Sequence, residues 1–375
     1  EGLEERLLLT SDSAGVIGLN AFRLDARFSG IDGSGSAVAV LDTGMDLDHP
    51  FFGADADSDG VADRIVYSYD FADGDEDAQD FQSNGSNVAS VIGSEDMMYK
   101  GIATGVDLIN LKVYSDDGTL SFSAVEQALQ WVQANAEAYN IVAVQMPVGD
   151  GENHTTSGSQ QDIGDEIASL SAMSVAVVAG AGDDYYTHSS SVGVGYPAAD
   201  PNTLSVGATY DSGTFGWTHE SGARAYSTAA DRIAAFSQRH ATLVDIFAPG
   251  SRIIGANRIG STVSRHGTSQ AAAHVTATVA LIQQLAEQEI GRRLTVTELR
   301  DLMSDTGTAV VDGDDEDDNV TNTGLTFQRL DVFDMAEEML VRGQSMYFDF
   351  GTASSPRAEG YIAVTEATTY NSLLG

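Results

Sequence analysis

The sequence predicts an α/β fold that is doubly wound, with a mostly parallel central sheet and helices on both faces. The first observation is a series of short apolar segments, rich in β-branched residues, that lack the polar alternation of a half-exposed strand. Such segments are typical of strands that are buried on both faces of a parallel sheet. The predicted strands are residues 36–43, 106–114, 141–147, 173–180 and 203–209.

The second observation is an amphipathic pattern between two of these strands. Apolar residues recur at steps of three and four from Phe122 to Ala136, which predicts a helix over about 121–139. A strand, a helix and a strand within about 40 residues make a βαβ unit, the building block of a parallel sheet. This unit therefore supports the same fold class.

Three further helices are predicted nearer the C-terminus. The longest covers residues 268–289 and begins with small side chains. The other two run from Thr297 to Ser304 and from Asp331 to Leu340. The acidic stretch 312–319, which lies between them, is expected to be a solvated loop.

The composition excludes several classes of protein. The chain has 375 residues, 42% of them hydrophobic, and a formal net charge of -38, so nucleic acid and anionic membranes are poor partners. No run of about 20 apolar residues is present, which argues against a membrane span. The absence of cysteine excludes disulfides, thiol catalysis and zinc–thiolate sites. The acidic charge suits either a salty medium or the binding of hard cations such as calcium.

Polar residues follow the predicted strands and open the predicted helices. Asp42 follows the first strand, Asn84 lies in a glycine-containing turn before a helix, and Ser269 opens the long helix. Sites in open α/β sheets form beyond the carboxyl ends of the strands, so these three residues are expected to converge there. An aspartate and a serine at a helix N-terminus are components of nucleophilic acyl transfer. Each residue also has an alternative, purely structural role: Asp42 can cap the turn after its strand, and Ser269 can serve as a residue of the helix N-terminus.

At these positions the chain resembles the subtilisin-like serine peptidases, or subtilases, over about residues 10–340. VAVLDTGMDLDHP resembles the segment that carries their catalytic aspartate, and GTSQAAAHV resembles their serine motif, GTSMAAPHV. Further segments follow in the family's order, among them GIATGVDLINLKVYSDDG and GYPAADPNTLSVGAT. The resemblance implies a subtilisin-like fold, with Asp42 and Ser269 in catalytic positions.

The chain departs from the family where the chemistry is expected. The family motif GHGTHVAG places its first histidine, the general base, where this chain has Asn84, and its second where it has Asn87. An amide cannot accept the serine proton at neutral pH. The family motif AAGN supplies a side-chain amide to the oxyanion hole, and the matching residue here is Asp183. Two smaller departures are Ala273, where the family has proline, and Pro147 in the expected substrate-binding strand.

These departures favour a subtilase homologue that is inactive or strongly impaired and that retains a cleft for a peptide or protein ligand. One alternative is an active serine endopeptidase with an unusual base, for which His266 is the candidate because it lies three residues before Ser269. That alternative includes a site that works in acid, with Asp183 protonated. A third possibility is a structural or adhesive surface module.

A calcium site is predicted in the segment DADSDGVAD. Acidic residues at alternate positions, followed by a glycine, are typical of a calcium-binding loop. The expected ligands are Asp55, Asp57, Asp59, the carbonyl of Val61, and Asp63. The acidic stretch 73–80 is instead expected to be a solvated loop.

The domain division follows the resemblance. Residues 1–342 are expected to form the subtilisin-like domain, and residues 343–375 a C-terminal β tail. The tail resembles the first strands of galactose-binding-like β-sandwich domains, so further C-terminal domains are expected. A location outside the cell or on its surface is also expected, although no secretory signal is recognised in the sequence.

Overall fold

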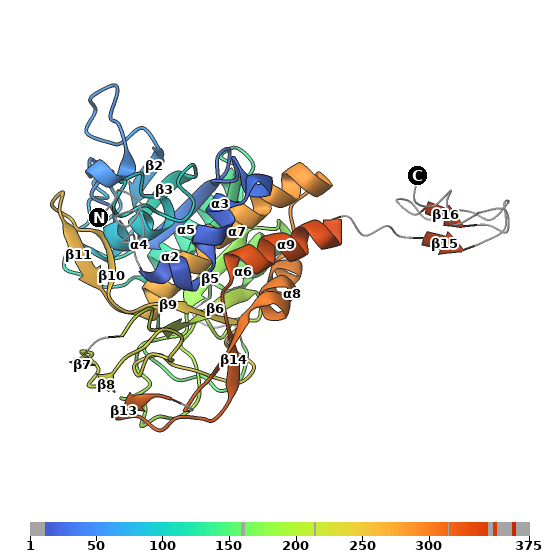
Figure 1. Cartoon of the computed structure of the whole chain (residues 1–375). Helices are drawn as coiled ribbons and strands as arrows, with labels where there is room; N and C mark the ends of the chain where they lie inside the picture. The colour runs from blue at the N-terminus through green and yellow to red at the C-terminus, as the bar shows by residue number, and fades with distance from the viewer. Residues whose placement is uncertain are drawn as a thin grey trace, which may run out of the picture.

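The computed structural model places a nine-stranded sheet at the centre of the molecule (Figure 1). The residues that it describes are 12–158, 162–213, 215–313, 315–343, 348–350 and 362–364. The strand order is β12-β14-β9-β6-β5-β4-β1-β3-β2. Every neighbouring pair is parallel except β12 and β14 at one edge, which are antiparallel. The predicted doubly wound, mostly parallel α/β fold is therefore confirmed.

All five predicted strands are present, as β1, β3, β4, β5 and β6. The largest shift is in β5, which begins three residues later than predicted, at Ala176, because the preceding helix continues to Ala172 and the chain turns after it. The strands of the central sheet are β1 Ala37–Asp42, β2 Ile65–Asp70, β3 Asp107–Lys112, β4 Ile141–Gln145, β5 Ala176–Gly180, β6 Thr203–Thr209, β9 Ile246–Pro249, β12 Thr308–Val311 and β14 Thr326–Arg329.

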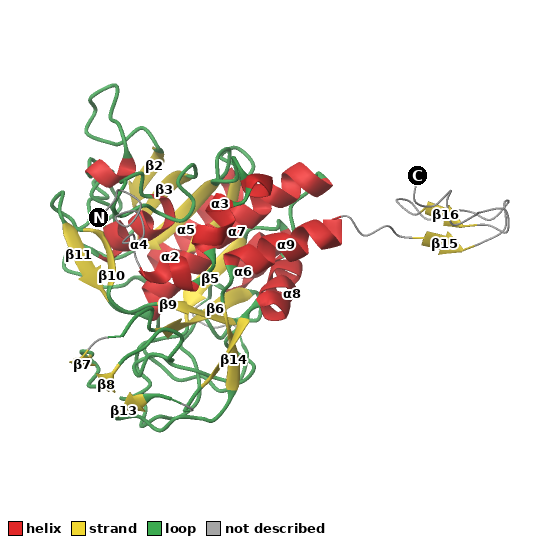
Figure 2. Ribbon diagram, viewed as in Figure 1, coloured by secondary structure: helices red, strands yellow, loops and turns green. Residues whose placement is uncertain are grey.

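Helices cover both faces of the sheet (Figure 2). On one face α5 and α6 pack over a core that they share with β1, β4 and β5. The other face carries the remaining helices, and their apolar side chains form a second core cluster. The helices are α2 Asp12–Val16, α3 Leu19–Leu24, α4 Asn84–Gly93, α5 Phe122–Asn135, α6 Gly164–Ala172, α7 Thr268–Ile290, α8 Val296–Thr306 and α9 Val332–Gly343, with short 3₁₀ turns at Ala26–Phe28 and Pro50–Phe52.

The four helices predicted from periodicity are α5, α7, α8 and α9. Helix α7 is buried along most of its length, from Thr268 to Ala286, and contacts the central strands. Its alanines and other small residues allow this close approach to the sheet. The helix ends at Gly291, which adopts a left-handed conformation with φ of 72°.

Smaller sheets lie outside the central one. Strands β7 Phe215–Thr218 and β8 Arg224–Ser227 form a hairpin, and β13 Asp317–Asp318 pairs with β8. Strands β10 Ile253–Ala256 and β11 Thr262–Arg265 form a second hairpin.

Within the predicted C-terminal tail, β15 Phe348–Phe350 and β16 Ile362–Val364 pair in parallel. The rest of residues 344–375, and with it most of the galactose-binding-like resemblance, lies outside the described residues. Among the helices of the described part, none is long and apolar enough to cross a bilayer.

The predictions of solvated loops at 312–319 and 73–80 are wrong in part, because each stretch contains a buried aspartate and Asp317–Asp318 form strand β13. Asp312 is fully buried and forms an ion pair with Arg239, which is also fully buried. The Arg239 guanidinium also lies over the ring of Tyr185, 4.1 Å from the ring centre. Because this guanidinium is buried, it needs a counter-charge beside it, which Asp312 supplies. Asp80 is 4% exposed, and its carboxylate accepts hydrogen bonds from Thr43 and Ser86. The acidic stretches therefore contain buried structural groups as well as solvated ones.

Candidate active site

Asp42 lies at the carboxyl end of β1, the strand at which the sheet changes winding direction. Strand β1 pairs with β3 on one side and β4 on the other, so connections diverge from this point and leave a crevice. The side chain is 1% exposed, and the backbone N–H of Thr43 donates to its Oδ1 over 2.6 Å. This is the position expected for a site residue.

Asn84 opens helix α4 and contacts Asp42 directly. Its Nδ2 donates to both carboxylate oxygens of Asp42, over 2.9 Å to Oδ2 and 3.2 Å to Oδ1. Gly85 makes this approach possible, because a Cβ at position 85 would lie 2.0 Å from the carbonyl oxygen of Gly44. The structure thus brings two of the three predicted residues, Asp42 and Asn84, into direct contact.

The Asp42–Asn84 pair contains no positive charge. Burial, and then the charge of Asp80, raise the pKa of Asp42 to about 7, and the hydrogen bonds from Thr43 and Asn84 only partly oppose this. A neutral amide can donate to the carboxylate but cannot balance its charge. Asp42 is therefore a buried acid that titrates near neutral pH.

Gln270 extends this polar chain, and the sequence analysis did not single it out. It is 1% exposed, and its Nε2 donates to Oδ1 of Asn84 over 3.1 Å and to Oδ1 of Asn87 over 3.2 Å. Asn84 and Asn87 are three residues apart and so share one face of α4. The sequence did contain an indication of this role, because Gln270 is a polar residue at the position where the family motif has methionine.

Ser269 is the second residue of α7 and lies beside Gln270. Nε2 of Gln145 donates to the Ser269 carbonyl oxygen over 3.0 Å, and Thr276 in turn donates to Oε1 of Gln145 over 2.6 Å. These contacts fix the backbone of the helix start against β4. Within the part of the chain that the structure describes, the Ser269 hydroxyl makes no hydrogen bond.

Asp183 follows β5 and caps the N-terminus of α7. Its Oδ1 accepts the backbone N–H of Thr268 over 2.8 Å, and the Thr268 hydroxyl accepts the N–H of Gly182 over 3.1 Å. The free N–H groups of a helix start are natural partners for a carboxylate. Burial nevertheless raises the pKa of Asp183 above its ordinary value.

A cavity of about 440 Å³ opens beside Ser269. It lies between the segments that follow β4 and β5, the start of α7 and the turn of the β7–β8 hairpin. Its lining residues are Pro147, Val148, Gly149, Gly151, Gly180, Gly182, Asp183, Asp184, Gly195, His219, Glu220, Ser221, Gln238, Thr268 and Ser269. Ser269, Asp183 and Pro147, which were predicted from different motifs, thus line one cavity. Ala273 is instead fully buried within α7.

His266 makes no hydrogen bond to Ser269 among the described residues. Its Nδ1 lies 2.9 Å from Oγ of Ser251 and accepts the backbone N–H of Arg252 over 3.1 Å. The ring stacks on Trp217 with 3.9 Å between ring centres, and burial lowers the pKa of His266 to about 4. The ring is thus held by the β10–β11 region and the β7–β8 hairpin.

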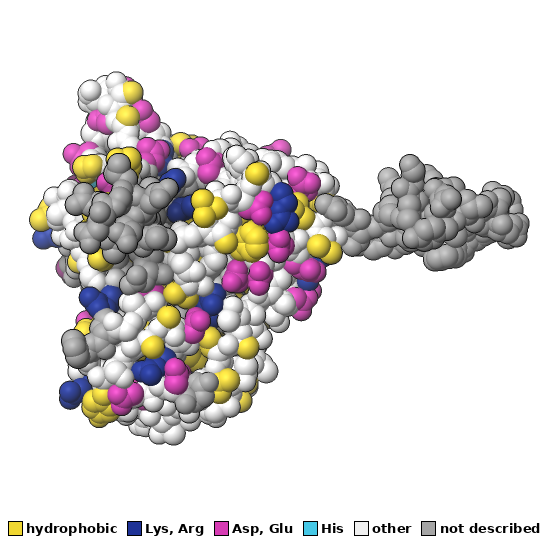
Figure 3. Space-filling model, in the orientation of Figure 1, with side chains coloured by type: hydrophobic (Ala, Val, Ile, Leu, Met, Phe, Trp, Pro, Cys, Tyr) yellow, Lys and Arg dark blue, Asp and Glu magenta, His cyan; other side chains and the backbone are white. Residues whose placement is uncertain are grey.

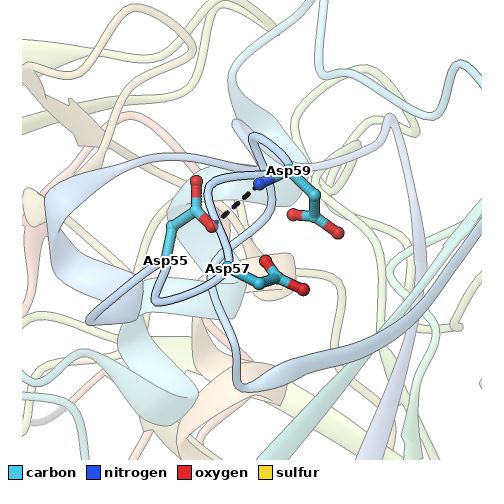
Figure 4. A group of neighbouring side chains, drawn as sticks. All are labelled: Asp55, Asp57 and Asp59. Atoms are coloured by element: carbon cyan, nitrogen blue, oxygen red, sulfur yellow. Dashed lines mark hydrogen bonds between the residues drawn. The ribbon is translucent and has the colours of Figure 1, made fainter.

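The predicted calcium loop follows the short turn Pro50–Phe52, and three of its acids face one another (Figure 4). Oxygens of Asp55, Asp57 and Asp59 lie within 4.8 Å of each other. Asp63 is not part of this group, and its Oδ1 accepts the N–H of Ala56 over 3.1 Å. Val61 packs against the core at the far side of the loop. Three hard oxygen donors that form no ion pair with a lysine or arginine of the described residues fit the ligand preference of calcium.

A second acidic group, of Asp70, Asp73 and Asp116, already contains a cation. Its carboxylate oxygens also lie within 4.8 Å of one another. Nζ of the buried Lys112 lies 2.7 Å from Asp70 and also pairs with Asp116. The single charge of the lysine ammonium balances one of the three carboxylates and is shared by Asp70 and Asp116.

A doubly wound sheet, with an aspartate at the switch point and a serine at the start of a buried helix, is the architecture that the resemblance to subtilases implied. The sequence model of the Subtilase family matches residues 33–326. The chain therefore belongs to the subtilase family.

Known relatives agree with this membership. The chain is 32% identical over 262 residues to the alkaline serine exoprotease A of Vibrio alginolyticus. This aligned region covers 70% of this chain and 41% of that protein. It is 27% identical over 275 residues to proteinase R of Parengyodontium album, covering 69% of this chain and 56% of that one. The chain thus corresponds to less than two thirds of the length of either relative.

A solved structure has the same fold. The crystal structure of a cold-adapted subtilisin-like serine proteinase matches with a TM-score of 0.58 and 27% sequence identity. The match covers 81% of this chain and 90% of that one. The subtilisin-like fold expected from the sequence is therefore confirmed.

Proposed function

We propose that this protein is a subtilase-family pseudo-peptidase, which has little or no hydrolytic activity and uses its cleft to bind a peptide or protein. In this proposal Asn84 stands at the position of the general-base histidine. The carrying observation is that Asn84 is held as a neutral amide, with Nδ2 donating to Asp42 and Oδ1 accepting from Gln270, and an amide oxygen is not a base at neutral pH. No group at this position can take the proton of Ser269. The test is whether a fluorophosphonate reacts with Ser269.

Asp183 supports the same proposal from the other side of Ser269. We place it where the family has the amide of the oxyanion hole. Its Oδ1 is an acceptor for the Thr268 N–H, so it supplies no donor there. An ionised carboxylate would oppose the negative charge that develops on the carbonyl oxygen, where a donor normally contributes roughly 10²–10³ in rate.

The alternative is an active endopeptidase that works in acid. It is favoured by one observation, namely that burial raises the pKa of Asp183. A protonated Asp183 is a hydrogen-bond donor. The base is the weak point of this alternative, because Nδ1 of His266 is occupied by Arg252 and its ring is stacked on Trp217. If neither labelling nor peptide binding is found, the structural or adhesive module becomes the better description.

We expect the Asn84→His substitution to restore little reactivity, with an increase in fluorophosphonate labelling of less than about tenfold. Nε2 of Gln270 now donates to Oδ1 of Asn84 and would donate to the new imidazole, in competition with Ser269. Asp183 would still lack an amide donor. The triple variant Asn84→His, Gln270→Met and Asp183→Asn should label roughly 10²–10³ times faster than Asn84→His alone.

The control for this series is the triple variant with Ser269→Ala added, which should show no labelling. Equal rates for the single and triple variants would contradict the roles given to Gln270 and Asp183. Melting temperatures of all variants show whether a slow rate reflects lost structure.

We also propose that calcium binds the loop of residues 55–63. Asp55, Asp57 and Asp59 would supply carboxylate oxygens, with the Val61 carbonyl and Asp63 completing the set after a local rearrangement. Binding to the folded state raises stability by mass action, by about 2.7 kcal/mol at a hundredfold excess over Kd. Calcium is therefore expected to raise the melting temperature by several degrees relative to a chelated sample.

Asp57→Asn is the informative variant for the calcium proposal, because its carboxylate makes no hydrogen bond within the described residues. The variant should lose most of the calcium-dependent shift while its chelated form melts like the chelated wild type. Asp301→Asn, an exposed aspartate of α8 whose carboxylate also accepts no hydrogen bond within the described residues, is the matched control. Identical melting curves with and without chelator would remove the proposal.

The proposed partner is a peptide or protein, and we propose an extracellular or cell-surface location with further C-terminal domains. The net charge of -38 disfavours nucleic acid and anionic membranes as partners. Acidic side chains are spread over the visible face of the molecule rather than gathered in one patch (Figure 3). Such a surface suits a salty medium, in which screening relieves the mutual repulsion of the acids.

A further inference from the structure

The polar groups that line the cavity beside Ser269 are rich in hydrogen-bond acceptors that lack donors. We propose that this cavity binds a cationic side chain, lysine or arginine, of the peptide ligand. The inference rests on the proposed function, because it assigns a ligand class to the same cleft. It is carried by three carboxylates and by one amide oxygen that faces the cavity.

The three carboxylates are those of Asp183, Asp184 and Glu220. None of them forms an ion pair with a lysine or arginine among the described residues, and no lysine or arginine lines the cavity. Oδ1 of Asp183 accepts the Thr268 N–H, and Oδ1 of Asp184 accepts the Thr187 hydroxyl over 3.0 Å. Within the described residues, Oδ2 of Asp184 and both oxygens of Glu220 accept no hydrogen bond. The cavity therefore carries acidic groups that no lysine or arginine of the described residues balances.

Gln238 is a second, independent indication. It lines the cavity and is 1% exposed. Its Nε2 donates to the Glu152 carbonyl over 3.1 Å and to Oδ1 of Asn153 over 2.9 Å, which fixes the orientation of the amide. Its Oε1 accepts no hydrogen bond from the described residues. This oxygen is not among the fully buried polar atoms that lack a partner, so it is open to the cavity and can accept a hydrogen bond from a ligand.

Gly182 explains how this oxygen reaches the cavity. A Cβ at position 182 would lie 1.9 Å from Oε1 of Gln238, and Gly182 itself has φ of 112°. Only glycine combines this backbone conformation with this close approach. Because Gly182 also lines the cavity, the Gln238 oxygen lies against its wall.

The chemistry of these groups selects the ligand. An ammonium carries three donors and no acceptor, and a guanidinium carries five donors and no acceptor. Either would satisfy the carboxylates and the Gln238 oxygen with charge-assisted hydrogen bonds. An apolar side chain would leave these acceptors unpaired, and an acidic one would be repelled.

The walls of the cavity come from separate parts of the chain. Asp183 and Asp184 follow β5, whereas His219 and Glu220 lie in the turn between β7 and β8. His219 packs edge-on against Trp217, with 5.6 Å between ring centres, and stacks on Phe236 at 4.6 Å. Trp217 thus lies next to the cavity wall, and its fluorescence can report on ligand binding.

The experiment compares four small probes on the full chain: the N-acetyl amides of arginine, lysine, norleucine and glutamate. Binding is measured by titration calorimetry and by Trp217 fluorescence. We expect the arginine and lysine amides to bind at least about tenfold more tightly than norleucine amide, and glutamate amide not to bind. Their affinity should fall as salt is raised, because screening weakens charge pairs. Equal affinity for arginine and norleucine amides would overturn the proposal.

Matched variants locate the binding. Glu220→Gln and Asp184→Asn should each weaken arginine amide binding about fivefold, as expected for a partly exposed ion pair. Gln238→Leu should also weaken it, and its melting temperature shows whether it folds. Glu289→Gln, an exposed acid at the end of α7, should have no effect. Loss of affinity in Glu289→Gln equal to that in Glu220→Gln would show a general charge effect and refute the site.

Failure of this inference is distinguishable from failure of the proposed function. Rapid labelling of Ser269 together with a clear preference for arginine amide would contradict the pseudo-peptidase alone. Absent labelling together with no preference for cations would contradict the cationic site alone.

Discussion

Ser269 is expected to stay unlabelled when the protein is incubated with a fluorophosphonate at pH 7.5, to the level of the Ser269→Ala variant. Reaction at the serine requires a group that takes its proton. Asn84 has both ends of its amide engaged, by Asp42 and Gln270. In subtilisin, removal of the catalytic histidine alone lowers kcat by about 10⁶, so the expected effect is very large.

The pH dependence of labelling separates the leading proposal from its rival. Mass spectrometry of labelled protein between pH 4 and pH 8 is the measurement. A pseudo-peptidase stays unlabelled throughout. Labelling that appears only in acid and disappears in Ser269→Ala would establish the acid-active alternative, and rapid stoichiometric labelling at pH 7.5 would refute the proposal outright. Casein hydrolysis by the wild type that is abolished in Ser269→Ala would also establish an active peptidase and refute the proposal.

The second large effect is expected at Asp42, where Asp42→Asn should stabilise the protein above neutral pH. Burial raises the pKa of Asp42 to about 7, whereas an unfolded aspartate has a pKa of about 3.9. The folded state therefore holds this proton more tightly than the unfolded state. The difference corresponds to at most about 4 kcal/mol.

The direction of the effect follows from proton binding. The stability that Asp42 contributes is fully present below pH 3.9, is lost as pH rises through about 7, and stays lost above it. An asparagine does not titrate, so the variant should match or fall below the wild type at pH 4 and exceed it at pH 8. Urea unfolding at both pH values is the measurement, with the exposed Asp301→Asn as the control. A variant that loses equal stability at both pH values would show that the ionised carboxylate of Asp42 does not destabilise the folded state.

Much of the fold was predictable, because burial on both faces leaves a direct mark on the sequence. The strands β1, β3, β4, β5 and β6 are apolar runs, and α5 and α7 have clear periodicity. The strands at and near the edges of the sheet were less visible: β2, β12 and β14 have mixed burial patterns and were not predicted. The short buried strand β9 was also not predicted. Asp42 and Ser269 were found because each lies in a contiguous motif.

The sequence by itself determined only those features that lie within one continuous segment of the chain. It established the subtilisin-like fold class, the absence of thiol chemistry, and an aspartate, an asparagine and a serine as the residues to examine. Only the tertiary structure showed that Gln270 donates a hydrogen bond to Asn84 and that Gln238 lines the cavity with an oxygen that has no donor among the described residues. It also showed that Arg239 and Asp312 form a buried ion pair. Hydrogen bonds and ion pairs depend on distance and direction between segments that are far apart in the chain. No local pattern records them, whereas burial repeats along each strand and helix and can be read from the residues in order.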